Sequence, residues 1–120
     1  MNGRILIVDD DHDWRQFVRY ALEDIGYEAV EAASGEEALA MMEQEQFPII
    51  LLDERLPGLS GTEVMARLPD PAPRVVLLTS APAERMGDAL ARHPSYYLPK
   101  DAGPDALTLI IRSLESHGPH

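Results

Sequence analysis

Short hydrophobic runs alternate with longer amphipathic segments along most of the chain. The runs RILIV and IILLD are continuous and only a few residues long, which is typical of strands buried on both faces of a sheet. The run YEAVEA alternates polar and apolar positions, as a half-buried strand does. The predicted strands cover residues 4–8, 27–32, 49–53, 74–80 and 96–98.

Helices are predicted between these strands, because apolar residues recur there every three or four positions. Trp14, Val18 and Leu22 share one face of the first helix, and Gly26 is a good stop signal after it. The second and third helices each begin with serine and glutamate at the spacing of a capping box. The predicted helices cover residues 13–25, 34–46, 62–68 and 83–93, and a last one begins at 103–104.

The alternation of strands and helices indicates an α/β domain, because parallel strands need crossover helices that cover both faces of the sheet. We expect a (βα)5 doubly wound five-stranded parallel sheet with the flavodoxin-like order 2-1-3-4-5. One domain is expected over residues 1–116, followed by a C-terminal tail or the start of a linker at 117–120. In such sheets the ligand site lies beyond the carboxyl ends of the strands, at the switch point between strands 1 and 3.

Chemically active residues stand at the predicted carboxyl ends. Asp9 and Asp10 follow strand 1, Asp53 ends strand 3, Thr79 lies at the end of strand 4 and Lys100 follows strand 5. Because strands 1 and 3 are neighbours in the expected order, three carboxylates should meet in one cleft. Their repulsion is relieved by a divalent cation with oxygen ligands such as Mg²⁺. A cation, an ammonium and a hydroxyl suit phosphoryl transfer to a carboxylate nucleophile.

Each of these residues has a simpler interpretation when taken alone. An acidic run after a strand is usually a solvated turn or a helix cap, and we assign Asp11 and Asp13 to that role. A threonine that ends a strand mostly satisfies nearby backbone, and a lone lysine can be a chance survivor of codon bias. The functional interpretation depends on the combination of these residues, because strands 1, 3, 4 and 5 all contribute to one site.

Composition narrows the choice of partners. The formal net charge of −11 argues against a nucleic-acid surface and against adsorption to an anionic membrane. The 120 residues include no cysteine, so they contain neither a disulfide nor a thiolate metal site. No apolar run reaches membrane length and no signal peptide is expected, so the expected location is cytoplasmic. Lys100 is the only lysine.

Four motifs resemble, in the right order, the receiver (response-regulator, CheY-like) domain of bacterial two-component signalling. They are ILIVDDDHDWRQFVRYALEDIGYEAVEAASGEEAL, IILLDERLPGLSG, VVLLTS and YYLPKDAGPDAL, and they extend over essentially the whole chain. The resemblance implies that Asp53 is the phosphoacceptor and that Asp9 and Asp10 hold Mg²⁺ (or Mn²⁺), Asp10 more directly and Asp9 mainly through water. It also implies that Asp53 and the backbone carbonyl of Arg55 are metal ligands. Lys100 would pair with the phosphoryl oxygens or, before phosphorylation, with Asp53.

The resemblance further implies a switch and a set of partners. Thr79 would contact the phosphoryl group, and Tyr97 occupies the position of the family's rotating aromatic switch. The phosphoryl group would come from a sensor histidine kinase or a histidine phosphotransfer protein. The face formed by helix 4, strand 5 and helix 5 would then bind a downstream protein or output domain, with Leu109 as a candidate contact, or support a homodimer. Direct binding of nucleic acid or a membrane is not expected.

The chain also departs from the family pattern. The short spacing between Asp53 and Thr79 predicts a trimmed third helix. LPKDA resembles the variant seen in receivers attached to helix-turn-helix output domains. Glu54 and Arg55 beside the phosphosite should tune the lifetime of the phosphoryl group.

Two other functions stay open at this level. The first is an interaction module of the same fold that signals without phosphate. The second is a Mg²⁺-dependent phosphohydrolase of the haloacid-dehalogenase type, although such enzymes usually carry a second acid where this chain has Arg55. The preferred interpretation is not an enzyme: it catalyses only its own phosphoryl transfer and slow autodephosphorylation. The four histidines are interpreted as ordinary surface residues.

Overall fold

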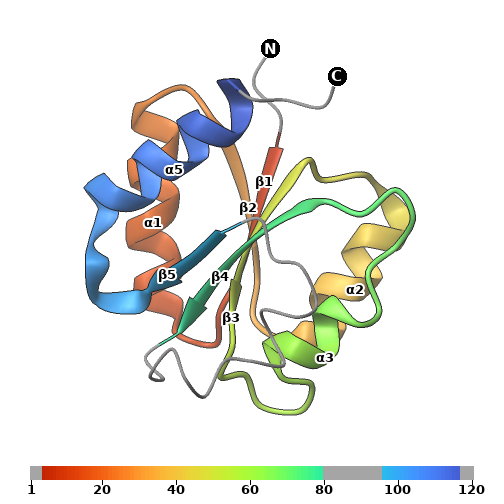
Figure 1. The fold of residues 1–120 in the computed structure, drawn as a ribbon. Coiled ribbons are helices and arrows are strands. Elements are labelled where there is room, and N and C mark those ends of the chain that lie inside the picture. Colours follow the sequence, from red (N-terminus) through yellow and green to blue (C-terminus); the bar gives the residue numbers. More distant parts are fainter. Residues whose placement is uncertain (1–3, 80–95, 117–120) are drawn as a thin grey trace.

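The sheet has the predicted order. The computed structural model describes residues 4–79 and 96–116, without the side chains of a few of them, including Thr79, Tyr96 and Tyr97. Its five parallel strands follow the order β2-β1-β3-β4-β5, which confirms the expected fold class (Figure 1). Their bounds are β1 Arg4–Val8, β2 Glu28–Ala32, β3 Ile49–Asp53, β4 Arg74–Thr79 and β5 Tyr96–Pro99.

Helices cover both faces of this sheet. Figure 1 shows α1 and α5 together on one face, and α2 and α3 together on the other. The helix predicted over residues 83–93 lies outside the described residues. None of the described helices is long and apolar enough to cross a membrane. The helices are α1 His12–Asp24, α2 Gly35–Gln44, α3 Gly61–Met65, the short 3-10 helix η2 Lys100–Ala102 and α5 Pro104–Ser116.

Successive strand residues enter two separate cores, because neighbouring side chains in a strand point to opposite faces. On β1, Leu6 and Val8 pack toward α2 and α3, while Ile5 and Ile7 pack toward α1 and α5. The central strand β3 alternates in the same way and is buried along its whole length. Helices therefore pack on both faces of the central strands, and this packing fixes the position of the residues that follow their carboxyl ends.

A few predicted bounds were wrong by one to three residues. Helix α1 begins one residue early, at His12, because the side chain of Asp11 caps it. Strand β2 starts one residue late, because the backbone N–H of Tyr27 still donates to Leu22 at the end of α1. Strand β4 is described as far as Thr79, and the predicted strand residue 80 lies outside the described residues, whereas β5 extends one residue further than predicted, to Pro99.

The third helix is shorter than the range 62–68. It covers Gly61–Met65, and Ala66 is its C-cap. A proline at position 69 disfavours helical backbone at Leu68, which was the predicted end of this helix.

Candidate functional site

Three carboxylates meet at the carboxyl ends of β1 and β3. These strands are paired in parallel with Val8 opposite Leu52, so the residues that follow them reach the same edge of the sheet. Carboxylate oxygens of Asp9, Asp10 and Asp53 lie within 4.8 Å of one another, and we call these three residues the acidic cluster. Asp9 is completely buried and Asp53 is 3% exposed, whereas Asp10 is open to solvent.

Lys100 brings the positive charge to this cluster. It is the first residue of η2, directly after β5, and its side chain is only 27% exposed. Its Nζ lies 2.7 Å from Oδ2 of Asp9 and 3.2 Å from Oδ2 of Asp53. The sequence prediction had named Asp53 as its partner before phosphorylation. The structure adds Asp9 as the closer one.

The remaining oxygens of the two buried carboxylates are held by the local backbone. Oδ1 of Asp9 accepts a hydrogen bond from the N–H of Asp11 at 2.8 Å, and Oδ1 of Asp53 accepts one from the N–H of Arg55 at 3.2 Å. Both residues therefore present Oδ2 to the centre of the site. The buried Oδ2 of Asp9 has the ammonium of Lys100, 2.7 Å away, as its ion-pair partner.

Burial and crowding make the carboxylate of Asp53 unfavourable. Burial raises the pKa of Asp53, and the neighbouring charge of Asp9 raises it further, against the attraction of Lys100. For Lys100, burial alone would lower the pKa, but the contacts with Asp9 and Asp53 raise it overall. The single positive charge of Lys100 is thus shared between two carboxylates, so a second cation would stabilise the acidic cluster.

The donor set fits a hard divalent cation. The three residues offer only oxygen ligands, and two of them point an oxygen into the site. Mg²⁺ prefers such ligands and usually takes few carboxylates, leaving positions for water and for a phosphate oxygen. The excess of negative charge, with three carboxylates close together and Lys100 paired with only two of them, is the sign in this structure that a further cation fits here.

Comparison with known proteins agrees with this geometry. A family model for the response regulator receiver domain matches residues 5–112. The chain belongs to this family. The transcriptional regulator AlgB of alginate biosynthesis from Pseudomonas aeruginosa is 38% identical over 110 residues, which are 89% of this chain and 24% of AlgB. The chain thus spans about a quarter of that relative's length.

Solved structures show the same relationship. A CheY-like receiver domain from Methanospirillum hungatei has a TM-score of 0.87 and 33% identity, covering 98% of this chain and 100% of that one. The response regulator TrrA from Thermotoga maritima, solved with Mg²⁺ and a beryllium fluoride, has a TM-score of 0.83 and 30% identity, covering 95% of this chain and 99% of that one. The protein is therefore a receiver domain related to the response regulators of two-component systems.

The first helix of the receiver domain begins within the acidic run. Asp11 is the N-cap of α1, and its Oδ1 accepts hydrogen bonds from the N–H groups of Asp13 at 3.0 Å and Trp14 at 3.2 Å. Asp13 lies in the first turn, where the helix dipole favours an acidic residue. The predicted role of Asp11 and Asp13 at the start of the helix is confirmed.

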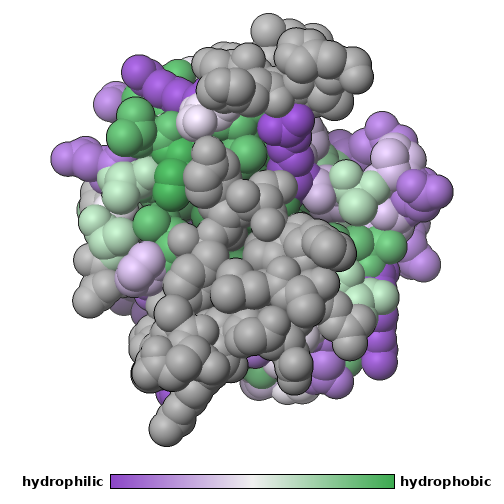
Figure 2. Space-filling model, viewed as in Figure 1, coloured by the Kyte–Doolittle hydropathy of each residue, from purple (hydrophilic) through white to green (hydrophobic). Residues whose placement is uncertain are grey.

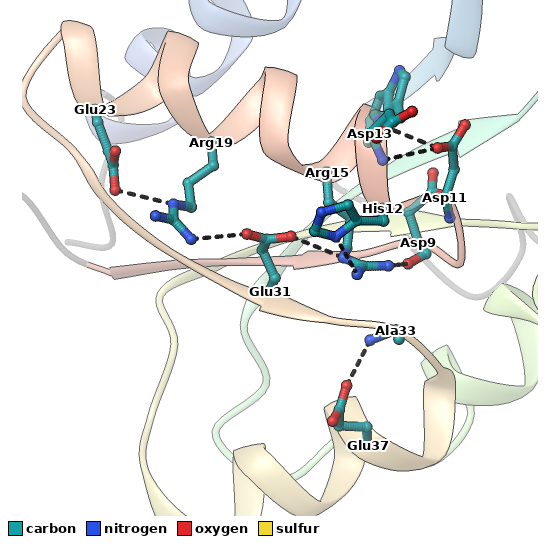
Figure 3. A network of polar contacts seen from close by, with 11 residues as sticks. Asp9, Asp11, His12, Asp13, Arg15, Arg19, Glu23, Glu31, Ala33 and Glu37 are labelled. Carbon is teal, nitrogen blue, oxygen red and sulfur yellow. Dashed lines mark hydrogen bonds and ion pairs between the residues drawn. The ribbon is translucent and has the colours of Figure 1, made fainter.

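A second group of charged side chains, on α1 and β2, contacts the backbone of the site. It was not predicted from the sequence. Nη1 of Arg15 donates to the backbone carbonyl of Asp9 at 2.6 Å, and Nε of Arg15 pairs with Glu31 at 3.0 Å. Glu31 also pairs with Arg19 at 2.9 Å, and Arg19 pairs with Glu23 at 3.3 Å (Figure 3). We call Arg15, Glu31, Arg19 and Glu23 the ion-pair chain. The four-residue spacing of Arg19 and Glu23 on one helix was the signal that could have revealed that pair.

The loop after Asp53 returns tightly to the site. Glu54 turns its carboxylate to the start of α3, where Oε1 accepts hydrogen bonds from the N–H of Thr62 at 2.8 Å and its hydroxyl at 2.7 Å. A Cβ on Gly61 would lie only 2.6 Å from the carbonyl oxygen of Asp53, so glycine allows this close approach. The hydrogen bonds of Glu54 and the close approach of Gly61 therefore both hold this loop against the backbone of Asp53.

Some predicted residues stay untested. Thr79 ends β4 and Tyr97 lies in β5, but their side chains are outside what the structure describes. Residues 80–95 and 117–120, with Ser80, His93 and the two C-terminal histidines, are also outside it. His12 is exposed, as predicted.

Proposed function

We propose that this receiver domain accepts a phosphoryl group on Asp53 from a sensor histidine kinase or a histidine phosphotransfer protein, in a reaction that depends on Mg²⁺ (or Mn²⁺). The observation that carries the proposal is a buried carboxylate whose Oδ2 lies 3.2 Å from the only lysine, beside two further carboxylates. Such an arrangement supplies a nucleophile and charge stabilisation in the same place.

In the proposed reaction a carboxylate oxygen of Asp53 attacks phosphorus. The phosphorus–nitrogen bond of the phosphohistidine breaks, a phosphorus–oxygen bond to Asp53 forms, and the departing imidazole keeps the electron pair and takes up a proton. Lys100 neutralises oxygens of the transferred group. It can do so because its ammonium already lies between the carboxylates of Asp9 and Asp53.

Asp10, Asp53 and the backbone carbonyl of Arg55 are the proposed metal ligands, with Asp9 acting mainly through water. When bound, the cation would neutralise the carboxylates and the oxygens of the incoming group. The hydrogen bond from the Arg55 N–H to Asp53 at 3.2 Å supports this placement, because it holds that residue beside the acceptor.

The proposed consequence is a change of partners. Thr79 and Tyr97 would shift on phosphorylation and alter the face of helix 4, β5 and α5, which then binds an output domain or downstream protein or forms a homodimer. The 69% exposure of Leu109 on α5 supports its role as a contact on that face. We further propose residues 1–116 as the receiver unit, 117–120 as a tail or linker, a cytoplasmic location, and no turnover of external substrates.

Intact-mass spectrometry tests this function. Incubation with Mg²⁺ and a small-molecule phosphodonor should add one phosphoryl group to the wild type and none to Asp53→Ala. An adduct that survives Asp53→Ala, or no adduct on the wild type, would overturn the proposal. Tight partner binding that is unchanged in Asp53→Asn would instead favour the phosphate-independent interaction module.

A further inference from the structure

Lys100 has a third neighbour besides its two carboxylates. Its Nζ lies 5.1 Å from the centroid of the Trp14 ring, within the distance of about 6 Å at which a cation is attracted to an aromatic face. Trp14 is the only tryptophan of the chain and Lys100 its only lysine. The contact thus joins two residue types that each occur once in the chain.

The indole is held firmly enough to act as a support. Trp14 lies in the first turn of α1, where its backbone N–H donates a hydrogen bond to the capping carboxylate of Asp11 at 3.2 Å. Its side chain packs against the core between the sheet, α1 and α5. The helix start therefore fixes the backbone of Trp14, and packing against the core supports its ring.

An apolar groove leads from this ring to the lysine. Trp14, Leu98, Pro99, Lys100, Gly103 and Leu107 are among its lining residues. The groove lies on the α1–α5 side of the molecule, where Figure 2 shows hydrophobic surface. A lysine stem can lie along such a surface while its ammonium stays in a polar site.

An aromatic ring suits this position better than another carboxylate would. Asp9 and Asp53 already attract the ammonium, but both are also needed for other tasks in the proposed reaction. A further carboxylate would add to the repulsion in the cluster and compete with its oxygens for a cation. The face of an indole attracts the ammonium without a formal charge, so it leaves the carboxylates free.

We propose that Trp14 is a positioning residue that holds Lys100 beside Asp53 while the carboxylates exchange their partners. When a cation or a phosphoryl group occupies the cluster, the ion pair between Lys100 and Asp9 must weaken. The ring then keeps the ammonium near the phosphoacceptor. This inference rests on the proposed role of Asp53, and it adds a residue to that site.

A double-mutant cycle on phosphorylation rates tests the kinetic part. Trp14→Leu should slow the addition of phosphoryl to Asp53 about two- to tenfold, and Trp14→Phe should slow it less, because a smaller ring keeps part of the attraction. In a Lys100→Met background, Trp14→Leu should have no further effect. Equal slowing in both backgrounds would mean a merely structural role and would overturn the proposal.

The matched control is Tyr20→Leu. Tyr20 is an exposed aromatic residue of the same helix, and its ring lies near Arg19, with 5.9 Å from the guanidinium to the centroid. Its loss should leave the rate unchanged. A slowing as large as that of Trp14→Leu would show that the effect is general to aromatic residues of this helix and would also overturn the proposal.

The fluorescence of Trp14 gives a second measurement that needs no tryptophan variant and no phosphorylation. Because the chain has no other tryptophan, its emission reports on this ring alone. Emission should change in Lys100→Met, and it should change in the wild type when Mg²⁺ and beryllium fluoride are added together. Identical emission in wild type and Lys100→Met would overturn the positioning role. If instead the emission responds but no phosphoryl group is accepted, the proposed function fails and the contact between Trp14 and Lys100 stands.

Discussion

Asp9 takes part in two groups of charged side chains that differ in how well their charges are matched. Its carboxylate belongs to the acidic cluster, in which the ammonium of Lys100 pairs with two of the three carboxylates. Its backbone carbonyl accepts a hydrogen bond from Arg15, the first member of the ion-pair chain. In that chain two guanidinium groups alternate with two carboxylates, so its charges balance.

The difference separates a structural use of charge from a functional one. In the ion-pair chain every charge has a partner, and the pairs join α1 to β2 across partly exposed surface. In the acidic cluster negative charge is in excess and two of the carboxylates are buried, which costs stability. Such a cluster supports the proposed binding of a cation. We expect variants to affect cation binding and phosphorylation at one group, and mainly stability at the other.

The largest effect is expected for Asp10→Ala. Loss of this exposed carboxylate should lower Mg²⁺-dependent phosphorylation by about 100-fold or more, since one electrostatic support of the transferred group disappears. Mg²⁺ at about ten times its dissociation constant should stabilise the wild type by roughly 1.4 kcal/mol. The variant should lose this gain. Intact mass and thermal unfolding with and without Mg²⁺ measure the two effects.

Asp13→Ala is the matched control in the same acidic run. Asp13 lies in the first turn of α1, so its removal should cost about 0.3–1 kcal/mol through the helix dipole. Phosphorylation and the stabilisation by Mg²⁺ should both be retained. If Asp10→Ala and Asp13→Ala behave alike, the division of the run into a metal pair and a helix start is wrong.

Glu31→Gln tests the other group and should have an intermediate effect. The side chain of Glu31 is 18% exposed and lies between Arg15 and Arg19. Neutralising it leaves two guanidinium groups without their shared partner, which should lower the free energy of unfolding by about 1–2 kcal/mol. Urea denaturation measures this loss. Phosphorylation at Asp53 should persist.

Glu23→Gln provides the comparison within the ion-pair chain. Its side chain is 43% exposed at the outer end of the ion-pair chain, so its loss should lower the free energy of unfolding by about 0.5 kcal/mol or less.

A loss of phosphorylation in Glu31→Gln without a loss of stability would contradict the structural role of the ion-pair chain. It would mean that the ion-pair chain acts on the site through the carbonyl of Asp9.

The two groups also differ in how far the sequence could predict them. Hydrophobic runs defined the strands, and parallel strands bring their carboxyl ends together, so the meeting of Asp9 with Asp53 followed from the strand order. The pairing of Lys100 with Asp53 was expected from the family resemblance, but its closer pairing with Asp9 was not, because a long side chain reaches several anions and its position depends on how η2 approaches β1. The pairing of Arg15 with Glu31 spans 16 residues and depends on the rotation of α1 over β2.

Unlike the changes above, Asp53→Asn should raise the stability of the protein. Burial and the charge of Asp9 raise the pKa of Asp53, so its ionised form is less favourable in the folded chain than in the unfolded one. Replacing it with a neutral side chain of the same shape should raise the free energy of unfolding at pH 7 by up to about 1 kcal/mol. The gain stays small because Lys100 already offsets part of the repulsion.

The pH dependence of that gain identifies its cause. A raised pKa means that the folded protein binds the proton of Asp53 more tightly than the unfolded chain does. The wild type therefore loses stability relative to Asp53→Asn as the pH rises from the ordinary value of 3.8 through the raised one, and the difference stays constant above that. Urea denaturation of both proteins between pH 4 and pH 7 measures this difference. A gain that does not shrink toward pH 4 would trace to packing rather than to charge, and the cost of negative charge at Asp53 would then lose its direct support.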